Sequence, residues 1–177
     1  MRLLLVRHGR TASNVSGLLD TAHPGAPLDE VGRAQAERLV ARLDGVGLGG
    51  LYSSDIHRAV QTATPLAQAR GLPLVELPGL REIPAGDQEL LPTWDAYIDV
   101  LRAWGEGRLT ERRPGGEDAH AFFARYDAAV ARIAEEGHAA ALLVSHGAAL
   151  RTWVSARVAG ISATEVAARR LGNTAIL

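Results

Sequence analysis

Five side chains with suitable chemistry stand at the ends of expected strands or just beyond them. Arg7 and His8 come directly after a short apolar run, and His146 follows a second, longer apolar run. Arg58 lies early in the helical segment after another such run, and Glu82 follows one more. Ligands of open parallel sheets bind beyond the carboxyl ends of the strands, so these five side chains are expected to converge there.

The residue types in this set fit the transfer of a phosphoryl group. Arginine offers a rigid, permanently charged fork of donors for the equatorial oxygens, which carry the negative charge. A neutral imidazole is a competent nucleophile near neutral pH, and a carboxylic acid can protonate the departing oxygen. Each residue alone has a plainer interpretation: His8 as a structural histidine, Arg58 as an exposed helix charge and Glu82 as a solvated loop glutamate.

Short apolar runs alternate with helical segments along the chain, and these elements would position the five side chains. Strands are expected at residues 3–6, 51–52, 74–77, 140–145 and 174–177, and helices at residues 28–43, 55–70, 94–104, 117–136 and 148–158. Asp29 is the expected N-cap of the first helix, and the helix at 117–136 is expected to carry an acidic first turn. This alternation predicts an α/β fold, a three-layer αβα sandwich with a mostly parallel central sheet.

The length of 177 residues fits one domain over residues 1–177, with a small irregular cap segment at about 78–116. A net charge of −1 gives no general attraction to nucleic acid or to an anionic membrane. The expected partner is therefore a small-molecule phosphomonoester. The opening apolar run is too short for a signal peptide, so a cytoplasmic protein is expected. The bias towards Ala, Leu, Gly and Arg is typical of a GC-rich bacterial gene.

Two residue types are missing, and their absence narrows the chemistry. The chain has no cysteine, and all 19 of its basic residues are arginine. Cysteine nucleophiles, zinc–thiolate sites, Schiff-base lysines and phosphate-loop lysines are therefore excluded. The histidines show no compact metal-ligand spacing, so neither a metal nor another cofactor is expected.

Other features of the sequence have ordinary structural interpretations. Residues 45–50 match Gly-x-Gly-x-x-Gly, but they follow a helix and precede a strand, the reverse of a dinucleotide site. Arg112 and Arg113 are either a solvated pair or contacts for an anionic part of a substrate. The other histidines are expected at the surface or behind the site, and the tryptophans in the core or lining a pocket: His23, His57, His120, His138, Trp94, Trp104 and Trp153.

Taken together and in order, the motifs resemble those of the histidine phosphatase superfamily, also called phosphoglycerate-mutase-like. The matching segments span most of the chain: residues 7–14 (RHGRTASN), 27–36 (PLDEVGRAQA), 53–63 (SSDIHRAVQTA), 80–82 (LRE), 114–117 (PGGE) and 144–147 (VSHG). Two departures concern the surroundings of the site. Arg10 stands where the family often has Glu or Gln, and residues 86–90 (GDQEL) replace the usual Gly-x-Trp-Glu-Gly.

The resemblance implies a role for each matched residue. It makes His8 the phosphorylated nucleophile and Glu82 the proton donor. Arg7, Arg58 and His146 would form the phosphate pocket. Asn14 would help them, and the N–H groups after His146, beginning at Gly147, could bind a phosphoryl oxygen.

The expected activity is that of a phosphoric monoester hydrolase acting through phosphohistidine, and three alternatives stand beside it. Small family members of this length resemble α-ribazole-5′-phosphate phosphatase, which acts in cobalamin assembly, so this ester is the first expected substrate. The first alternative is a broad-specificity sugar-phosphate phosphatase. A phosphoglycerate mutase-type isomerase would need more lid material than residues 78–116 offer. A module that binds phosphorylated ligands without turnover would not need the full catalytic set.

Overall fold

A four-stranded parallel sheet forms the centre of the computed structural model, which describes residues 1–160 and 171–177. Its strand order is β1-β4-β2-β3, so the last strand enters between the first two. The strands are β1 (Arg2–Arg7), β2 (Gly50–Ser53), β3 (Leu74–Glu76) and β4 (Ala140–Ser145). The helices are α1 (Ala12–Ser16), α2 (Glu30–Arg42), α3 (His57–Arg70), α4 (Asp95–Gly105), α5 (Ala119–Glu135) and α6 (Gly147–Arg157), with 3-10 turns at Pro78–Leu80 (η1) and Gly86–Gln88 (η2).

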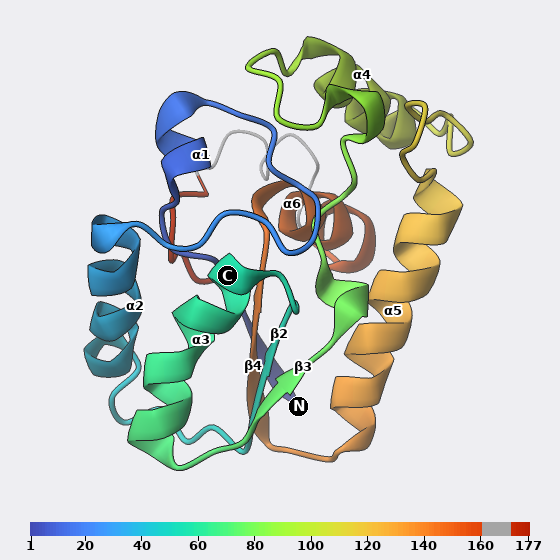
Figure 1. The fold of residues 1–177 in the computed structure, drawn as a ribbon. Helices are drawn as coiled ribbons and strands as arrows, with labels where there is room; N and C mark the ends of the chain where they lie inside the picture. Colours follow the sequence, from blue (N-terminus) through green and yellow to red (C-terminus); the bar gives the residue numbers. More distant parts are fainter. Residues whose placement is uncertain (161–170) are drawn as a thin grey trace.

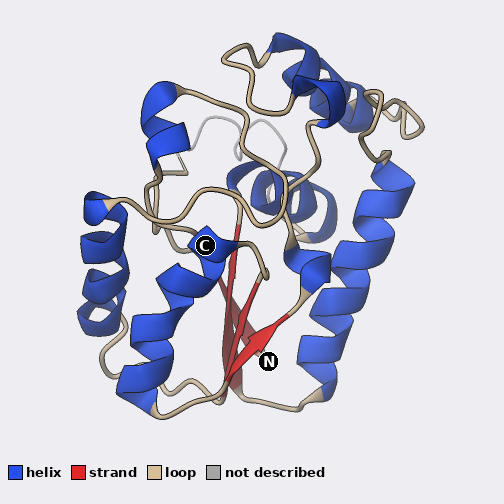
Figure 2. Cartoon of the chain, in the orientation of Figure 1, coloured by secondary structure: helices blue, strands red, loops and turns tan. Residues whose placement is uncertain are grey.

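Helices cover both faces of this sheet, and the alternation of side chains along the strands sorts the core into two clusters (Figures 1 and 2). Leu5 and Leu143 point to one face and pack with residues of α5 and α6. Leu4 and Leu142 point to the other face, which α2 and α3 cover. Side chains alternate faces with a period of two, so one register sets both clusters. The predicted three-layer αβα sandwich is confirmed.

α3 and α5 each begin two residues after the acidic residue expected to start them, and in both cases an arginine binds that acidic residue. The first expected helix does have Asp29 as its N-cap, with the side chain accepting the Gly32 N–H at 2.7 Å. α3 begins at His57 rather than at Asp55, whose carboxylate instead accepts from Arg81. α5 begins at Ala119, behind the N-cap Asp118, so the expected acidic first turn was wrong.

The last residues form a different structure from the strand expected there. They run antiparallel beside β1, but only as an isolated bridge between Val6 and Ile176. The Leu5 N–H donates to the Leu177 carbonyl at 3.0 Å, and the Leu177 N–H donates to the Leu5 carbonyl at 2.8 Å. The segment therefore covers the edge of β1 without extending the ladder.

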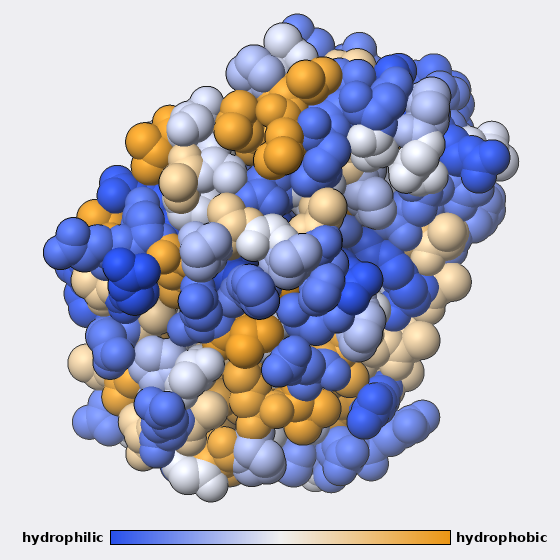
Figure 3. Space-filling view, viewed as in Figure 1, coloured by the Kyte–Doolittle hydropathy of each residue, from blue (hydrophilic) through white to orange (hydrophobic). Residues whose placement is uncertain are grey.

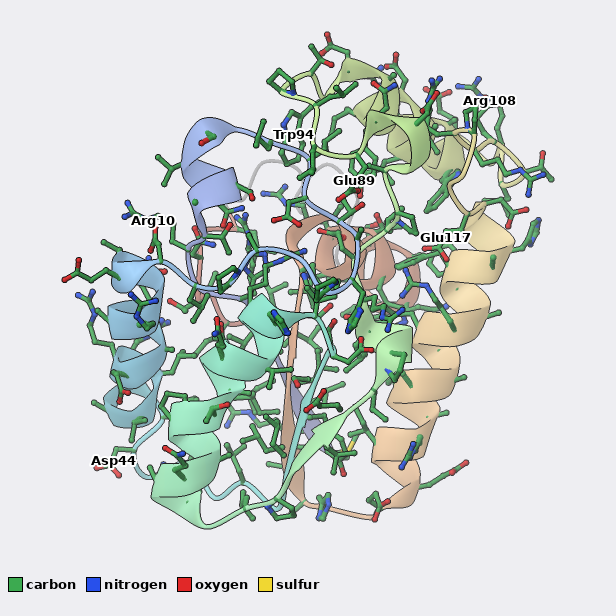
Figure 4. All side chains as sticks on the ribbon, viewed as in Figure 1. Arg10, Asp44, Glu89, Trp94, Arg108 and Glu117 are labelled. Atoms are coloured by element: carbon green, nitrogen blue, oxygen red, sulfur yellow. The ribbon has the colours of Figure 1, made fainter. Side chains whose placement is uncertain are left out.

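The cap, which the sequence analysis placed at about 78–116, is tied to the loop after α1. The Leu90 N–H donates to the Leu19 carbonyl at 2.7 Å, and the Leu19 N–H donates to the Leu91 carbonyl at 3.0 Å. The Trp94 side chain, labelled in Figure 4, donates from its indole N–H to the Gly17 carbonyl at 2.6 Å. Figure 3 shows apolar side chains at the surface near this end of the molecule. No helix within residues 1–160 and 171–177 is long and apolar enough to cross a membrane.

Leu90 stands where the family pattern has its second glycine, and it keeps a glycine-like backbone. Its φ is +59°, in the left-handed region that costs a side-chain-bearing residue about 1 kcal/mol or more. The side chain is 55% exposed, so its packing offsets only part of that cost. The substitution of the glycine has therefore kept the turn and added an exposed apolar side chain.

We expect Leu90→Gly to leave the free energy of unfolding unchanged to within about 0.5 kcal/mol, because relief of the left-handed strain offsets the lost apolar contact. The neighbouring Leu91→Gly is the matched control and is expected to lower stability by about 1–2 kcal/mol, since its φ is not in the positive range. Urea unfolding of both variants measures the difference. Equal losses would show that Leu90 carries no strain.

Candidate active site

A cavity of about 1210 Å³ opens at the carboxyl ends of the strands. It is bounded by the loops after β1 and β3 and by α1, α4, α5 and α6. Six of the predicted site residues line it: Arg7, His8, Asn14, Arg58, Glu82 and Gly147. His146, the seventh, is fully buried and is not among the lining residues. The sheet therefore gathers side chains that are up to 140 positions apart in the sequence, counted from Arg7 to Gly147.

The two site histidines are neighbours because β1 and β4 pair in register, with Arg7 opposite Ser145. The His8 N–H donates to the Ser145 carbonyl at 3.0 Å, and the His8 and His146 ring centroids are 5.3 Å apart. The His8 ring Nδ1 lies 2.7 Å from the Gly9 carbonyl oxygen. A carbonyl only accepts, so Nδ1 carries the proton, and Nε2 of a neutral ring keeps a lone pair, the electronic requirement of a nucleophile.

Burial lowers the pKa of His8 well below its ordinary value, and the charges of Arg58 and Arg7 lower it further. Burial likewise lowers the pKa of His146, helped by Arg58 and by His8. Both rings are therefore neutral near pH 7, as a nucleophilic imidazole must be. Both nitrogens of His146 are buried without a hydrogen-bond partner in the described part of the chain.

Arg58 is the most enclosed cation of the site. Its side chain is 3% exposed and faces Asp20, whose side chain is 8% exposed. One guanidinium nitrogen lies 3.5 Å from Asp20 Oδ1, and the other donates to the Asp20 carbonyl at 2.9 Å. A Cβ on Gly25, whose φ is +68°, would lie 2.6 Å from Arg58 Nη1. Burial lowers the pKa of Arg58 and Asp20 partly restores it, so the cation is held by a dedicated counter-ion.

Thr62 joins Arg58 to the nucleophile loop. Its hydroxyl donates to the Arg58 carbonyl at 2.6 Å and accepts the Gly9 N–H at 2.9 Å. The loop after β1 and the first turn of α3 are thus fixed relative to each other through one side chain.

Arg7 reaches the site from the last residue of β1. Its Nη1 donates to the Leu171 carbonyl at 2.6 Å, while Nε is buried without a partner in the described residues. A Cβ on Gly147 would lie 3.3 Å from that Nε, so the absence of a side chain gives the guanidinium its room. Burial lowers the pKa of Arg7, and the charge of Glu82 offsets part of this effect.

Glu82 occupies the amino end of α6. Its Oε1 accepts the N–H groups of Ile83 at 3.0 Å and Ala149 at 2.7 Å, and its Oε2 accepts that of Ala148 at 3.1 Å. A helix amino end favours a carboxylate for the same reasons that it favours phosphate. The N–H groups that follow His146 were expected to bind a phosphoryl oxygen. In this structure two of them, those of Ala148 and Ala149, donate to Glu82 instead.

Asn14 forms a capping box with Thr11 around α1, and its side chain has a defined orientation. Its Oδ1 lies 3.2 Å from the Thr11 N–H and 3.1 Å from the Asn173 side-chain amide. The acceptor is therefore engaged, and the amide NH₂ is the group of Asn14 that can donate into the cavity. Asn173 also donates to the His8 carbonyl at 3.1 Å, a support that the sequence analysis missed.

Several other residues of the sequence analysis lie outside the cavity wall. Arg113 pairs with Asp87 at 2.9 Å, and neither Arg112 nor Arg113 lines the cavity. Glu89 accepts the N–H groups of Thr21 and Ala22, so its carboxylate fixes the loop beside Asp20. Arg10, the departure after Arg-His-Gly, pairs with Asp29 at 2.8 Å at the amino end of α2 (Figure 4). His120, Trp94 and Trp104 do line the cavity.

Comparisons with known proteins identify the family of this chain. Residues 3–177 match the family model of the histidine phosphatase superfamily (branch 1), and the chain belongs to that superfamily. Adenosylcobalamin/alpha-ribazole phosphatase of Escherichia coli strain K12 is 32% identical over 166 residues, 92% of this chain and 81% of that protein. The probable phosphoglycerate mutase GpmB of Proteus mirabilis is 33% identical over 180 residues, 99% of this chain and 83% of that protein.

A solved structure shows the same fold. Mycobacterial glucosyl-3-phosphoglycerate phosphatase, determined in complex with VO3, superposes with a TM-score of 0.81 at 28% identity, over 99% of this chain and 90% of that one. The expected fold class and the expectation of a histidine-phosphatase-type enzyme are confirmed.

The buried histidines predict an acid-sensitive fold. In the unfolded chain their pKa returns to the ordinary 6.5, so below that pH the unfolded state binds protons that the folded state does not. Stability is therefore expected to fall as the pH drops through 6.5. The loss between pH 7.5 and 5.5 is about 1.4 kcal/mol for each histidine.

Urea unfolding at both pH values, for the wild type and for His8→Gln and His146→Gln, measures this contribution. Each variant should lose about 1.4 kcal/mol less than the wild type on acidification, because glutamine does not titrate. Between pH 7.5 and 8.5 the variants and the wild type should show the same pH dependence. Parallel acid losses in all three proteins would contradict the assignment of neutral, buried rings.

Proposed function

We propose that the chain hydrolyses phosphomonoesters through a phosphohistidine at His8. The observation that supports this most directly is the hydrogen bond from His8 Nδ1 to the Gly9 carbonyl, because it leaves Nε2 as the nucleophile of a cavity-lining ring. Arg7 and Arg58 line the same cavity and would neutralise the phosphoryl oxygens. Nε2 attacks phosphorus as the bond from phosphorus to the alcohol oxygen breaks.

Glu82 is the proposed proton donor for that departing oxygen. Of its two oxygens, Oε2 accepts only the Ala148 N–H, at 3.1 Å, whereas Oε1 accepts two shorter bonds. Oε2 is therefore the oxygen that would carry the proton. In the second step water attacks the phosphorus, the bond to Nε2 breaks, and Glu82 takes the proton from water. Each step moves one proton, and the second step restores both His8 and Glu82.

The cavity favours a large leaving alcohol. At about 1210 Å³ it is much larger than a phosphoryl group needs. Leu19, Tyr97, Leu101 and Phe123 contribute apolar surface to its wall. α-Ribazole 5′-phosphate, a ribose carrying an aromatic base, suits such a wall, and the similarity to the Escherichia coli enzyme supports the same choice. A glycosylated phosphate ester is the second candidate, favoured by the cavity's volume and by the mycobacterial structure.

A mutase activity has less support from the lining residues. A mutase retains a bisphosphorylated intermediate, which calls for a second cluster of cations facing the first. Two further arginines of the cavity wall, Arg102 and Arg157, already pair with Asp99 and Asp127. We therefore place hydrolysis ahead of isomerisation.

Phosphate release and the interconversion of 2- and 3-phosphoglycerate, measured on one preparation, test this choice. We expect steady phosphate release from α-ribazole 5′-phosphate without a bisphosphate primer, and a loss of more than about 1000-fold in His8→Ala. Circular dichroism checks that the variant is folded. Isomerisation that outpaces phosphate release and responds to 2,3-bisphosphoglycerate would favour the mutase, and near-normal turnover by His8→Ala would refute the mechanism.

Glu82→Gln tests the proton donor through the leaving group. An alkoxide needs protonation as it departs, whereas p-nitrophenolate needs little. The variant should therefore lose about 10²-fold or more in kcat on alkyl phosphates and far less on p-nitrophenyl phosphate. Asp87→Asn, at a carboxylate paired with Arg113 outside the cavity, is the control and should affect both esters alike. An equal loss on both esters in Glu82→Gln would assign proton donation to another group.

A further inference from the structure

Four consecutive backbone carbonyls around the proposed proton donor accept hydrogen bonds from side chains. Those of Gly79, Arg81 and Glu82 accept from Arg125, at 2.8, 2.9 and 3.1 Å. The remaining one, of Leu80, accepts from the Ser145 hydroxyl at 2.8 Å. The end of η1 and the loop after it lack the ladder of a longer helix or strand and would otherwise leave such groups to water, so this segment is held at every residue.

Arg125 is fully engaged in this arrangement. Besides the three carbonyls, its Nε and Nη2 donate to the two oxygens of Glu117, at 2.9 and 2.5 Å. These five bonds equal the five N–H donors that a guanidinium has. Glu117 stands just before α5, facing the site end of the molecule (Figure 4), and keeps the fork in one orientation. Arg125 itself does not line the cavity.

The same segment lies against the backbone of α5. A Cβ on Gly79 would come within 2.5 Å of the Arg125 carbonyl oxygen. The backbone at Gly79 and the backbone of α5 are therefore in contact, with no side chain between them. On the other side the Ser145 hydroxyl accepts from Tyr126 at 3.1 Å while it donates to Leu80. Residues 79–82 are therefore clamped between α5 and β4, and the clamp includes the backbone carbonyl of Glu82.

We propose that Arg125, oriented by Glu117, is a positioning residue for Glu82. The proposal rests on the proposed function, in which Glu82 protonates the leaving oxygen. A misplacement of about 1 Å in such a group costs on the order of 10²-fold in rate. Neither Arg125 nor Glu117 contacts Arg7, His8 or Arg58 through a hydrogen bond or ion pair in the described residues, whereas Arg125 holds the Glu82 carbonyl. The charge of Arg125 also lowers the pKa of His146, and Arg125→Lys keeps that charge.

The test compares two esters on one enzyme preparation. Arg125→Lys keeps the charge but loses the fork, and Glu117→Gln removes the charge that orients it. We expect kcat on an alkyl phosphate to fall about tenfold more than kcat on p-nitrophenyl phosphate in both variants. The ratio of the two rates is independent of how much protein is folded, so partial unfolding does not obscure the result. If Arg125→Lys fails to fold, Glu117→Gln alone still gives the ratio of the two rates.

Arg70→Gln is the matched control. Arg70 also donates from its guanidinium to a carbonyl, that of Leu43, but at the end of α3 away from the cavity. It should leave the ratio of the two rates unchanged. In the Glu82→Gln background, Arg125→Lys should change the ratio no further, because the group it positions is already disabled.

An unchanged ratio in Arg125→Lys and Glu117→Gln, or a further change of the ratio in the Glu82→Gln background, would overturn the inference. Failure of the proposed function would look different. If His8→Ala kept its activity, the phosphohistidine mechanism would fall whatever the ratio. If turnover needed His8 but the two Arg125 and Glu117 variants kept the wild-type ratio, only the positioning role would fall.

Discussion

The ion pair between Arg58 and Asp20 is the interaction on which the cationic end of the site depends. Removing a guanidinium from water costs several kcal/mol, and an ion pair offsets this only when its remaining hydrogen-bonding groups are satisfied. Asp20 meets that condition, because its second carboxylate oxygen accepts from the Ser13 hydroxyl at 2.7 Å and the Ala26 N–H at 3.0 Å. Positive charge can then stay buried beside two imidazoles, whose pKa values burial lowers most and the guanidinium lowers further. A charged guanidinium and two neutral rings can thus share one enclosed site.

The two halves of the proposed reaction rest on different parts of the fold. The nucleophile depends on the register between β1 and β4, since this places His8 beside His146. The proton donor depends on the packing of residues 79–82 against α5. Part of the wall around a leaving alcohol comes from a third part, the cap, which includes α4 and is tied to the loop after α1, and another part comes from α5 and α6. Changes in the cap can therefore alter the alcohol that fits while the reacting groups stay in place.

Much of the fold could be predicted from the sequence, because periodicity and capping are local signals. The run at 140–145 became β4 with the same bounds, and Asp29 caps α2 as expected. α1 was missed because its five residues are too few to show a helical period. The start of α3 shifted because Asp55 binds Arg81, 26 positions away, instead of capping the helix. Such long-range pairing leaves no local pattern in a single sequence.

The same division holds for the site. Five side chains that follow strands were expected together, and four of them line one cavity, with His146 buried behind it. The residues that hold them were not expected, because nothing near Asp20, Asn173 or Arg125 marks its partner. Thr62 is the exception that a closer reading could have found, since it lies four positions after Arg58 and therefore on the same helix face.

The contacts of residues 171–177 with β1 also determine when, during synthesis, the site can be completed. The Asn173 side chain binds the His8 carbonyl across 165 positions, and the Thr174 and Ala175 backbone groups bond to Arg7. A ribosome adds about 5–20 residues per second. The partners of β1 at residues 171–177 are therefore synthesised on the order of ten seconds after β1 itself. Until then the nucleophile loop lacks part of its support, and the nascent chain carries His8 without a completed site around it. The site proposed here is thus completed only after nearly all of this sequence has been made.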